Sequence, residues 1–129
     1  MLPFTVSLHA GEPVYGQVVY AVRRAVVTGQ LRAGDAFPSV RELSQALKIN
    51  PNTAHRIVAL LIDDGLLTVR PGIGTVVSGS QAGDADARRE VLEQHTERLV
   101  VDAKHSGVTL EKLISAIRRH WSRTIGKAG

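Results

Sequence analysis

The sequence contains no cysteine, few aromatic residues and no long apolar run. The absence of cysteine excludes disulfides, zinc–thiolate sites and thiol catalysis from this chain of 129 residues. Aromatic residues make up only 4% of the chain, so we expect a core built mostly from Leu, Ile, Val and Ala. No apolar stretch approaches the ~20 residues that span a bilayer, and the amino terminus shows no signal-peptide pattern. We therefore expect a soluble, cytoplasmic protein.

The charge of the chain is moderately positive. A formal net charge of +4 and a sequence pI near 10.0 suit a polyanionic partner, because Lys and Arg that neutralise phosphates release counterions. A soluble basic protein without a polyanionic partner can have the same net charge and pI. Residues 1–79 carry seven Lys/Arg against five Asp/Glu, and residues 80–129 carry nine against seven, so each part is +2. A nucleic-acid function must therefore be argued from where the charges lie.

Apolar spacing and capping residues predict two helices in the first 50 residues. Apolar residues three and four apart indicate a helix over residues 14–27, between Pro13 and Gly29. A capping box formed by Ser39 and Glu42 predicts a second, short helix that ends near Lys48. The expected inner faces contain Val14, Val18, Val22, Ala25 and Val26 in the first helix and Val40, Leu43, Ala46 and Leu47 in the second, with Ser44 and Gln45 pointing outward.

The segment KINPNTAHRI (48–57) opens a third helix. Asn50 is a strong N-cap residue, Pro51 is preorganised for the first helical position, and Gly65 suits the left-handed conformation that ends a helix. The stripe expected to be buried comprises Ala54, Ile57, Val58, Leu61 and Ile62.

The order of elements predicts the fold class. Residues 67–70 and 75–78 are β-prone, and the turn residues 71–74 between them indicate a hairpin. Helix, short helix, capped helix and hairpin, in that order, form a winged helix-turn-helix. A small polar linker then precedes two amphipathic patterns, one ending near His105 and one starting at the cap Thr109. We predict a mainly α protein with a small β-hairpin, in which a winged helix-turn-helix domain (1–78) and a linker (79–86) precede a short two-helix dimerisation segment (87–129).

Four stretches occur in register along residues 7–79: EPVYGQV, GQLRAGDAFPSVRELSQAL, NPNTAHRIVALLIDDGLL and VRPGIGTVV. Together they resemble the GntR family of bacterial transcription regulators. PVYGQ, NPNT and a short two-helix tail are similar to the YtrA-like subfamily. This resemblance implies a dimeric repressor, often of an operon for an ABC-type transporter. We expect no cofactor. The wing differs, because Arg70 and Pro71 stand where the family often has two basic or polar residues.

Winged helices bind DNA through the first turns of the third helix, while the second helix braces the phosphate backbone. Asn pairs with adenine and Arg with guanine, and a helix amino terminus attracts phosphate. Arg41 opposes the dipole of its own helix, which indicates a functional reason for the charge. The alternatives are that Arg41 is merely solvated, that Lys48 serves only solubility, that Asn52 and Thr53 only form a polar first turn, and that the glycines are needed only for the hairpin. The predicted DNA-binding residues are Arg41, Lys48, Asn50, Asn52, Thr53, His55, Arg56, Arg70, Gly72 and Gly74.

Neither tail helix can bury its apolar stripe alone, so we expect pairing with a second copy of the chain. Two recognition helices would then bind an inverted repeat of double-stranded DNA. One alternative adds an unknown small-molecule effector, which would have to bind at the dimer interface or the domain junction. The predicted dimer contacts are Leu92, Leu99, Leu110, Leu113, Ile114, Ile117 and Trp121.

The remaining patterns favour neither a metal site nor an enzyme. His95 and His105 lie ten residues apart, too far along one helix for a single ion, and no metal-binding spacing occurs. The sequence has no phosphate-binding loop and no recognisable catalytic triad. The rival hypothesis is a winged helix that binds a partner protein, which predicts an apolar outer face on the third helix.

Overall fold

The computed structural model describes residues 2–79 and 85–125, with side chains to Arg123. The described residues fall into two compact units, an amino-terminal unit (2–79) and a carboxyl-terminal unit (85–125). Most of the linker predicted at 79–86 lies outside the described residues, which resume at Ala85 in a helix. No helix in the described ranges is both long enough and apolar enough to cross a membrane.

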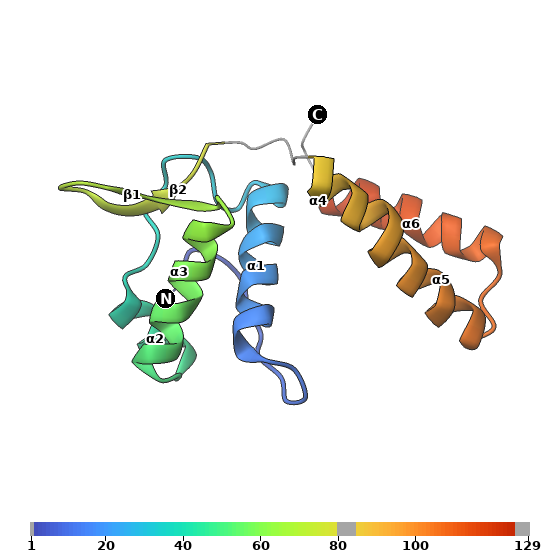
Figure 1. Ribbon diagram of the computed structural model, residues 1–129, viewed down its shortest axis with the longest axis horizontal. Helices are drawn as coiled ribbons and strands as arrows, with labels where there is room; N and C mark the ends of the chain where they lie inside the picture. The colour runs from blue at the N-terminus through green and yellow to red at the C-terminus, as the bar shows by residue number, and fades with distance from the viewer. Residues whose placement is uncertain (1, 80–84, 126–129) are drawn as a thin grey trace. The chain divides into compact units, whose positions relative to one another are not determined.

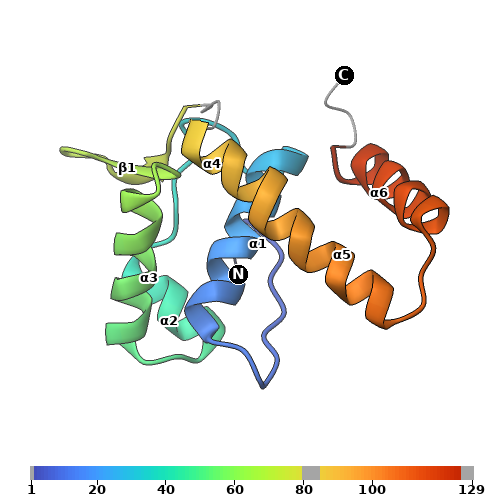
Figure 2. The same cartoon turned by 45° about the vertical axis from the view of Figure 1, so that its right-hand side comes forward.

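The amino-terminal unit is a winged helix-turn-helix, as predicted (Figure 1). Its elements are α1 (Val14–Thr28), α2 (Val40–Leu47), α3 (Pro51–Asp63), β1 (Leu67–Arg70) and β2 (Gly74–Val77). In both views α2, α3 and the hairpin lie to one side of α1 (Figures 1 and 2).

Aliphatic side chains from every helix of this unit and from both strands form its core. Each fully buried Val, Leu or Ile contributes about 1.5–3 kcal/mol through the hydrophobic effect. One aromatic pair joins them: the rings of Phe4 and Phe37 stack with centroids 5.6 Å apart and planes inclined by 13°. The largest fully buried side chains are those of Leu31, Leu43, Ile57, Leu61, Leu67, Val18, Val22 and Val77.

The capping box at the start of α2 is confirmed. Ser39 N–H donates to Glu42 Oε1 at 2.9 Å, and Glu42 N–H donates to Ser39 Oγ at 3.1 Å. Hydrogen bonds from Ser39, mainly from its backbone, hold the pKa of the Glu42 carboxyl below its usual value.

The predicted inner face of α2 is wrong at two positions. Ala46 is exposed, whereas Ser44 is buried beside Leu43 with 7% of its surface exposed. The hydroxyl of Ser44 donates to the Arg41 carbonyl at 3.1 Å, so its burial leaves no polar group unpaired.

Both ends of α3 follow the predicted signals. Asn50 Oδ1 accepts the N–H of Asn52 at 2.7 Å, and Pro51 is the first helical residue. Gly65 has φ 83°, and its N–H donates to the Ile62 carbonyl while Leu66 N–H donates to the Leu61 carbonyl, both at 3.0 Å. This pair of bonds is a Schellman motif, which satisfies carbonyls that the helix end leaves free.

The hairpin is held against the rest of the unit by a third extended segment. β1 and β2 pair antiparallel from Leu67 opposite Val77 to Arg70 opposite Gly74, so β2 begins one residue earlier than predicted. Phe37 N–H donates to the Thr75 carbonyl at 2.9 Å, and Val77 N–H donates to the Asp35 carbonyl at 2.8 Å. The wing is therefore bonded to the segment that leads into α2.

The carboxyl-terminal unit consists of α4 (Ala85–Arg89), η1 (Glu90–His95), α5 (Thr96–His105) and α6 (Leu110–Ile125). We predicted one uniform helix to His105, but η1 is π-helical, and the Thr96 hydroxyl donates to the carbonyl of Val91, five residues earlier, at 2.8 Å. Gly107 ends α5, and Thr109 Oγ1 accepts the N–H of Lys112 at 3.2 Å to cap α6. α6 then reverses the chain direction (Figure 1).

Candidate nucleic-acid interface

The amino-terminal half of α3 presents polar side chains outward. Asn52, His55 and Arg56 are exposed and Thr53 is half-buried, while Ala54 and Ile57 on the opposite face are buried in the core. Arg56 forms no ion pair and no side-chain hydrogen bond with any described residue. The rival hypothesis required an apolar outer face on this helix, and its exposed first turns are polar instead.

Asn50 has a structural role in addition to the predicted contact. Its side-chain oxygen is engaged in the cap of α3, which leaves the amide N–H groups as the part available to a partner. The cap fixes the helix at the end that carries Asn52 and Arg56. It also keeps the positive end of the helix dipole at this surface.

The second helix and the turn after it add two cations. Arg41 is exposed in the first turn of α2 and pairs with no described acidic residue, and the nearby Glu42 carboxylate is occupied by the capping box. Lys48 is exposed at the carboxyl end of α2, with φ 57° and ψ 48°. Both charges are therefore available to an anionic partner.

The wing carries the third group of predicted residues. Arg70, Gly72 and Gly74 are exposed, and both glycines have positive φ values: 77° at Gly72 within the three-residue tip and 115° at Gly74, the first residue of β2. Sequence reasoning missed Ile73, which stands at the tip with 72% of its surface exposed. A large apolar residue between two glycines is the signal that identifies it.

Most acidic residues of this unit have partners outside the predicted DNA-binding residues. Asp64 Oδ2 accepts a hydrogen bond from Arg23 at 2.8 Å, and this ion pair links the end of α3 to α1. Asp35 accepts the N–H of Arg32 at 2.9 Å, and Glu12 lies 3.6 Å from His9. The arginines of α2, α3 and the wing thus keep their charge unneutralised by described residues.

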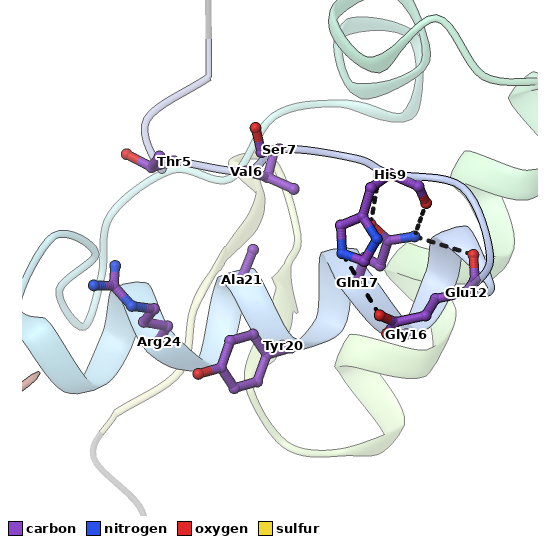
Figure 3. A pocket seen from close by; sticks show the side chains of 10 residues that line it. All are labelled: Thr5, Val6, Ser7, His9, Glu12, Gly16, Gln17, Tyr20, Ala21 and Arg24. Carbon is purple, nitrogen blue, oxygen red and sulfur yellow. Dashed lines mark hydrogen bonds and ion pairs between the residues drawn. The ribbon is translucent and has the colours of Figure 1, made fainter. Parts of the chain in front are cut away.

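A separate cleft of about 390 Å³ lies between the amino-terminal arm (residues 2–9) and α1. Figure 3 shows the arm residues Thr5, Val6 and Ser7 on one side of the cleft and the α1 residues Tyr20, Ala21 and Arg24 on the other. The Gln17 side chain holds the arm in place, accepting His9 N–H at 2.9 Å and donating to the carbonyls of His9 and Glu12 at 2.9 and 3.0 Å. Sequence reasoning did not identify this cleft, because it forms only where the arm folds back along α1, and no sequence pattern predicts that contact.

The predicted dimer residues are mostly exposed in the carboxyl-terminal unit. Leu92 exposes 71% of its surface and Trp121 69%, and Leu113 is half-buried. Ala103 is the buried residue of α5.

Among residues 2–79 and 85–125, no group of three or more His, Asp or Glu side chains is placed to hold a metal ion.

Comparisons with known proteins agree with this geometry. The family described as "Bacterial regulatory proteins, gntR family" matches residues 14–77. The HTH-type transcriptional repressor YtrA of Bacillus subtilis (strain 168) is 30% identical over 102 residues, which cover 78% of each chain. A GntR family transcriptional regulator from Listeria monocytogenes is similar in structure, with a TM-score of 0.66 and 28% identity over 87% of this chain and 98% of that one. A transcriptional antiterminator from Listeria monocytogenes EGD-e has the same fold, with a TM-score of 0.82 and 23% identity over 95% of this chain and 92% of that one.

Proposed function

Because this chain belongs to the GntR family of bacterial regulatory proteins, and is thus a transcriptional regulator rather than an enzyme, we propose that it is a repressor that binds an operator as a homodimer. The observation that carries this proposal is the exposed, capped amino end of α3 with its polar side chains. A repressor acts by occupying DNA that the transcription machinery needs, so the protein itself requires only binding.

Recognition divides between the three parts of the site. Asn52, Arg56 and the other polar residues of the first α3 turns contact base edges in the major groove. Arg41 binds the phosphate backbone, as do the amide of Asn50 and the free N–H groups at the start of α3. The wing tip enters the minor groove, with Arg70 against a phosphate.

The homodimer is supported by the apolar surface of the carboxyl-terminal unit. Its helices expose large side chains that a monomer leaves in water, and such surface normally marks an interface. A two-fold pair of these helices buries both stripes in one bundle and presents two α3 helices to an inverted repeat, with half-sites one or more turns of about 10 bp apart. The exposed apolar residues are Val91, Leu92, Leu99, Val100, Val101, Val108, Leu110, Ile114, Ile117 and Trp121.

Selection from a random duplex pool, followed by sedimentation of the complex, tests the proposal. We expect recovery of an inverted repeat bound by two chains. A sequence without two-fold symmetry, or a complex with one chain, contradicts the dimeric mode, and failure to enrich any sequence contradicts operator binding. Deletion of the gene should raise transcription of its targets, which we propose include a transporter operon.

We expected an effector to bind at the dimer interface or the domain junction. The cleft beside α1 lies within the amino-terminal unit instead, and it supports a second proposal, a small anionic effector. Arg24 lines the cleft and pairs with no described acidic residue. A Cβ atom added at Gly16 would meet no atom within 4 Å, so the cleft is open beside Gly16. The arm also carries Phe4, whose partner Phe37 lies two residues before the α2 cap, so a ligand here is linked to the DNA-binding helices.

Thermal unfolding across a panel of carboxylates and phosphates tests the effector. A ligand at 100 times its Kd raises stability by about 2.7 kcal/mol, which is readily measured. We expect a stabilising compound that also changes DNA affinity and that no longer stabilises the Gly16→Leu variant, in which the leucine fills the cleft. Equal stabilisation of parent and variant places the compound elsewhere.

A further inference from the structure

Lys48 is the one residue other than glycine, within residues 2–79 and 85–125, whose backbone lies in the left-handed region. Its Cβ crowds the following carbonyl oxygen there, so an L-residue is disfavoured relative to glycine. The chain places glycine at comparable helix ends, with Gly29 after α1, Gly65 after α3 and Gly107 after α5. Only the end of α2 carries a lysine in this conformation.

Hydrogen bonds and packing on both sides of Lys48 hold its backbone in this conformation. The N–H groups of Lys48 and Ile49 both donate to the Ser44 carbonyl, the latter at 3.0 Å. Ile49 then packs against the core, and Asn50 caps α3. The turn between α2 and α3 is therefore too short and too well bonded to move Lys48 into a more favourable conformation.

The Lys48 side chain has no compensating contact within the protein. It is exposed and forms no ion pair or side-chain hydrogen bond with a described residue. It emerges two residues before the α3 cap, at the same end of α3 as Asn52. A cation at this position also interacts favourably with the negative end of the α2 dipole. A purely structural role of this kind is the alternative to a contact with DNA.

We propose that Lys48 stands in this strained position because its ammonium binds a DNA backbone phosphate beside the contact of α3 with the groove. The proposal rests on the DNA-binding function proposed above and adds a specific consequence. Fold stability and DNA affinity therefore favour different residues at position 48. The left-handed turn prefers glycine, but glycine has no ammonium group with which to bind phosphate.

The test is Lys48→Gly in the full-length protein. Relief of the left-handed strain should raise the Tm by about 4 °C. Loss of one phosphate contact should reduce the slope of log K against log salt by about 0.9 for each chain bound. At 0.1 M salt this corresponds to about eightfold weaker binding for each chain, on operator and scrambled duplexes alike, with the difference vanishing near 1 M salt.

Three further variants separate charge from strain. Lys48→Arg keeps the cation and should keep the salt slope, whereas Lys48→Asn, which tolerates the left-handed region, should lose it. Gly29→Lys places a lysine at the left-handed end of α1, so its Tm should fall while its salt slope stays that of the parent.

Each outcome decides a different part of the argument. A Lys48→Gly variant that is more stable and binds DNA like the parent overturns the phosphate contact and leaves a role at the α2 dipole. If Lys48→Gly has a lower Tm than the parent, the claim that Lys48 is in a strained conformation is wrong. If the parent itself binds no duplex, the proposed function fails together with the contact, whereas the stability comparison of Lys48 and Gly29 variants still stands on its own.

Discussion

Arg56 offers a direct test of base recognition, because nothing within the described protein depends on its side chain. The guanidinium is exposed and makes no internal ion pair or hydrogen bond, so Arg56→Ala should change the free energy of unfolding by less than about 0.5 kcal/mol. A bidentate contact between arginine and guanine discriminates against a wrong base by about 1–3 kcal/mol. Any loss of affinity by a folded variant is therefore a loss at the interface, about 5- to 150-fold for each half-site.

Fluorescence anisotropy on a selected operator and on a scrambled duplex, at several salt concentrations, measures this effect. Arg56→Ala should lose affinity for the operator more than for the scrambled sequence. Arg56→Lys separates charge from shape, because it keeps the phosphate attraction but not the bidentate fork. Arg32→Ala, an exposed arginine outside the predicted site, is the matched control and should leave the preference unchanged. Equal operator affinity of Arg56→Ala and the parent would refute the assignment of α3 to base recognition.

Three other predictions concern the fold and the dimer. Leu61 is fully buried, so Leu61→Ala should lower the free energy of unfolding by about 2–5 kcal/mol in urea denaturation, and a loss below 1 kcal/mol contradicts the observed core. The Glu42 pKa is lowered on folding, so its stabilisation is present above the ordinary value of 4.5 and is lost as the pH falls through the folded value. Between pH 6 and 3, the Tm of Glu42→Gln should consequently depend less on pH than that of the parent. If the two proteins show the same dependence of Tm on pH, the capping box does not cause the loss of stability in acid. Trp121→Ala removes a large exposed apolar side chain and should raise the dimer dissociation constant at least tenfold in sedimentation equilibrium, while an unchanged constant excludes this part of α6 from the interface.

The sequence predicted those features that depend on residues close together in the chain. The cap at Asn50, the capping box at Ser39 and the end of α3 at Gly65 each rest on hydrogen bonds within five residues. The two strands were predicted for the same reason, since a short tip joins them. The polar side of α3 followed from helical periodicity, which is strong over the length of that helix.

Features that depend on distant packing were missed. The burial of Ser44 in place of Ala46 follows from the angle at which a short helix meets the core, and an eight-residue helix has too few positions to fix that angle by periodicity. The Arg23–Asp64 ion pair and the arm held by Gln17 join segments that carry no mutual signal in sequence. The π-helical stretch before Thr96, which the Thr96 hydroxyl accompanies with a bond to the Val91 carbonyl, has no signal in the apolar spacing.

The pairing of β2 with residues 34–37 has a mechanical consequence for binding. The N–H of Phe37 donates to the Thr75 carbonyl, and two residues later Ser39 caps α2. These bonds restrict movement of the hairpin relative to α2 and α3, the helices that we propose to contact DNA. The ordering of these three parts is completed when the chain folds, so little conformational entropy is left to be lost when it meets DNA.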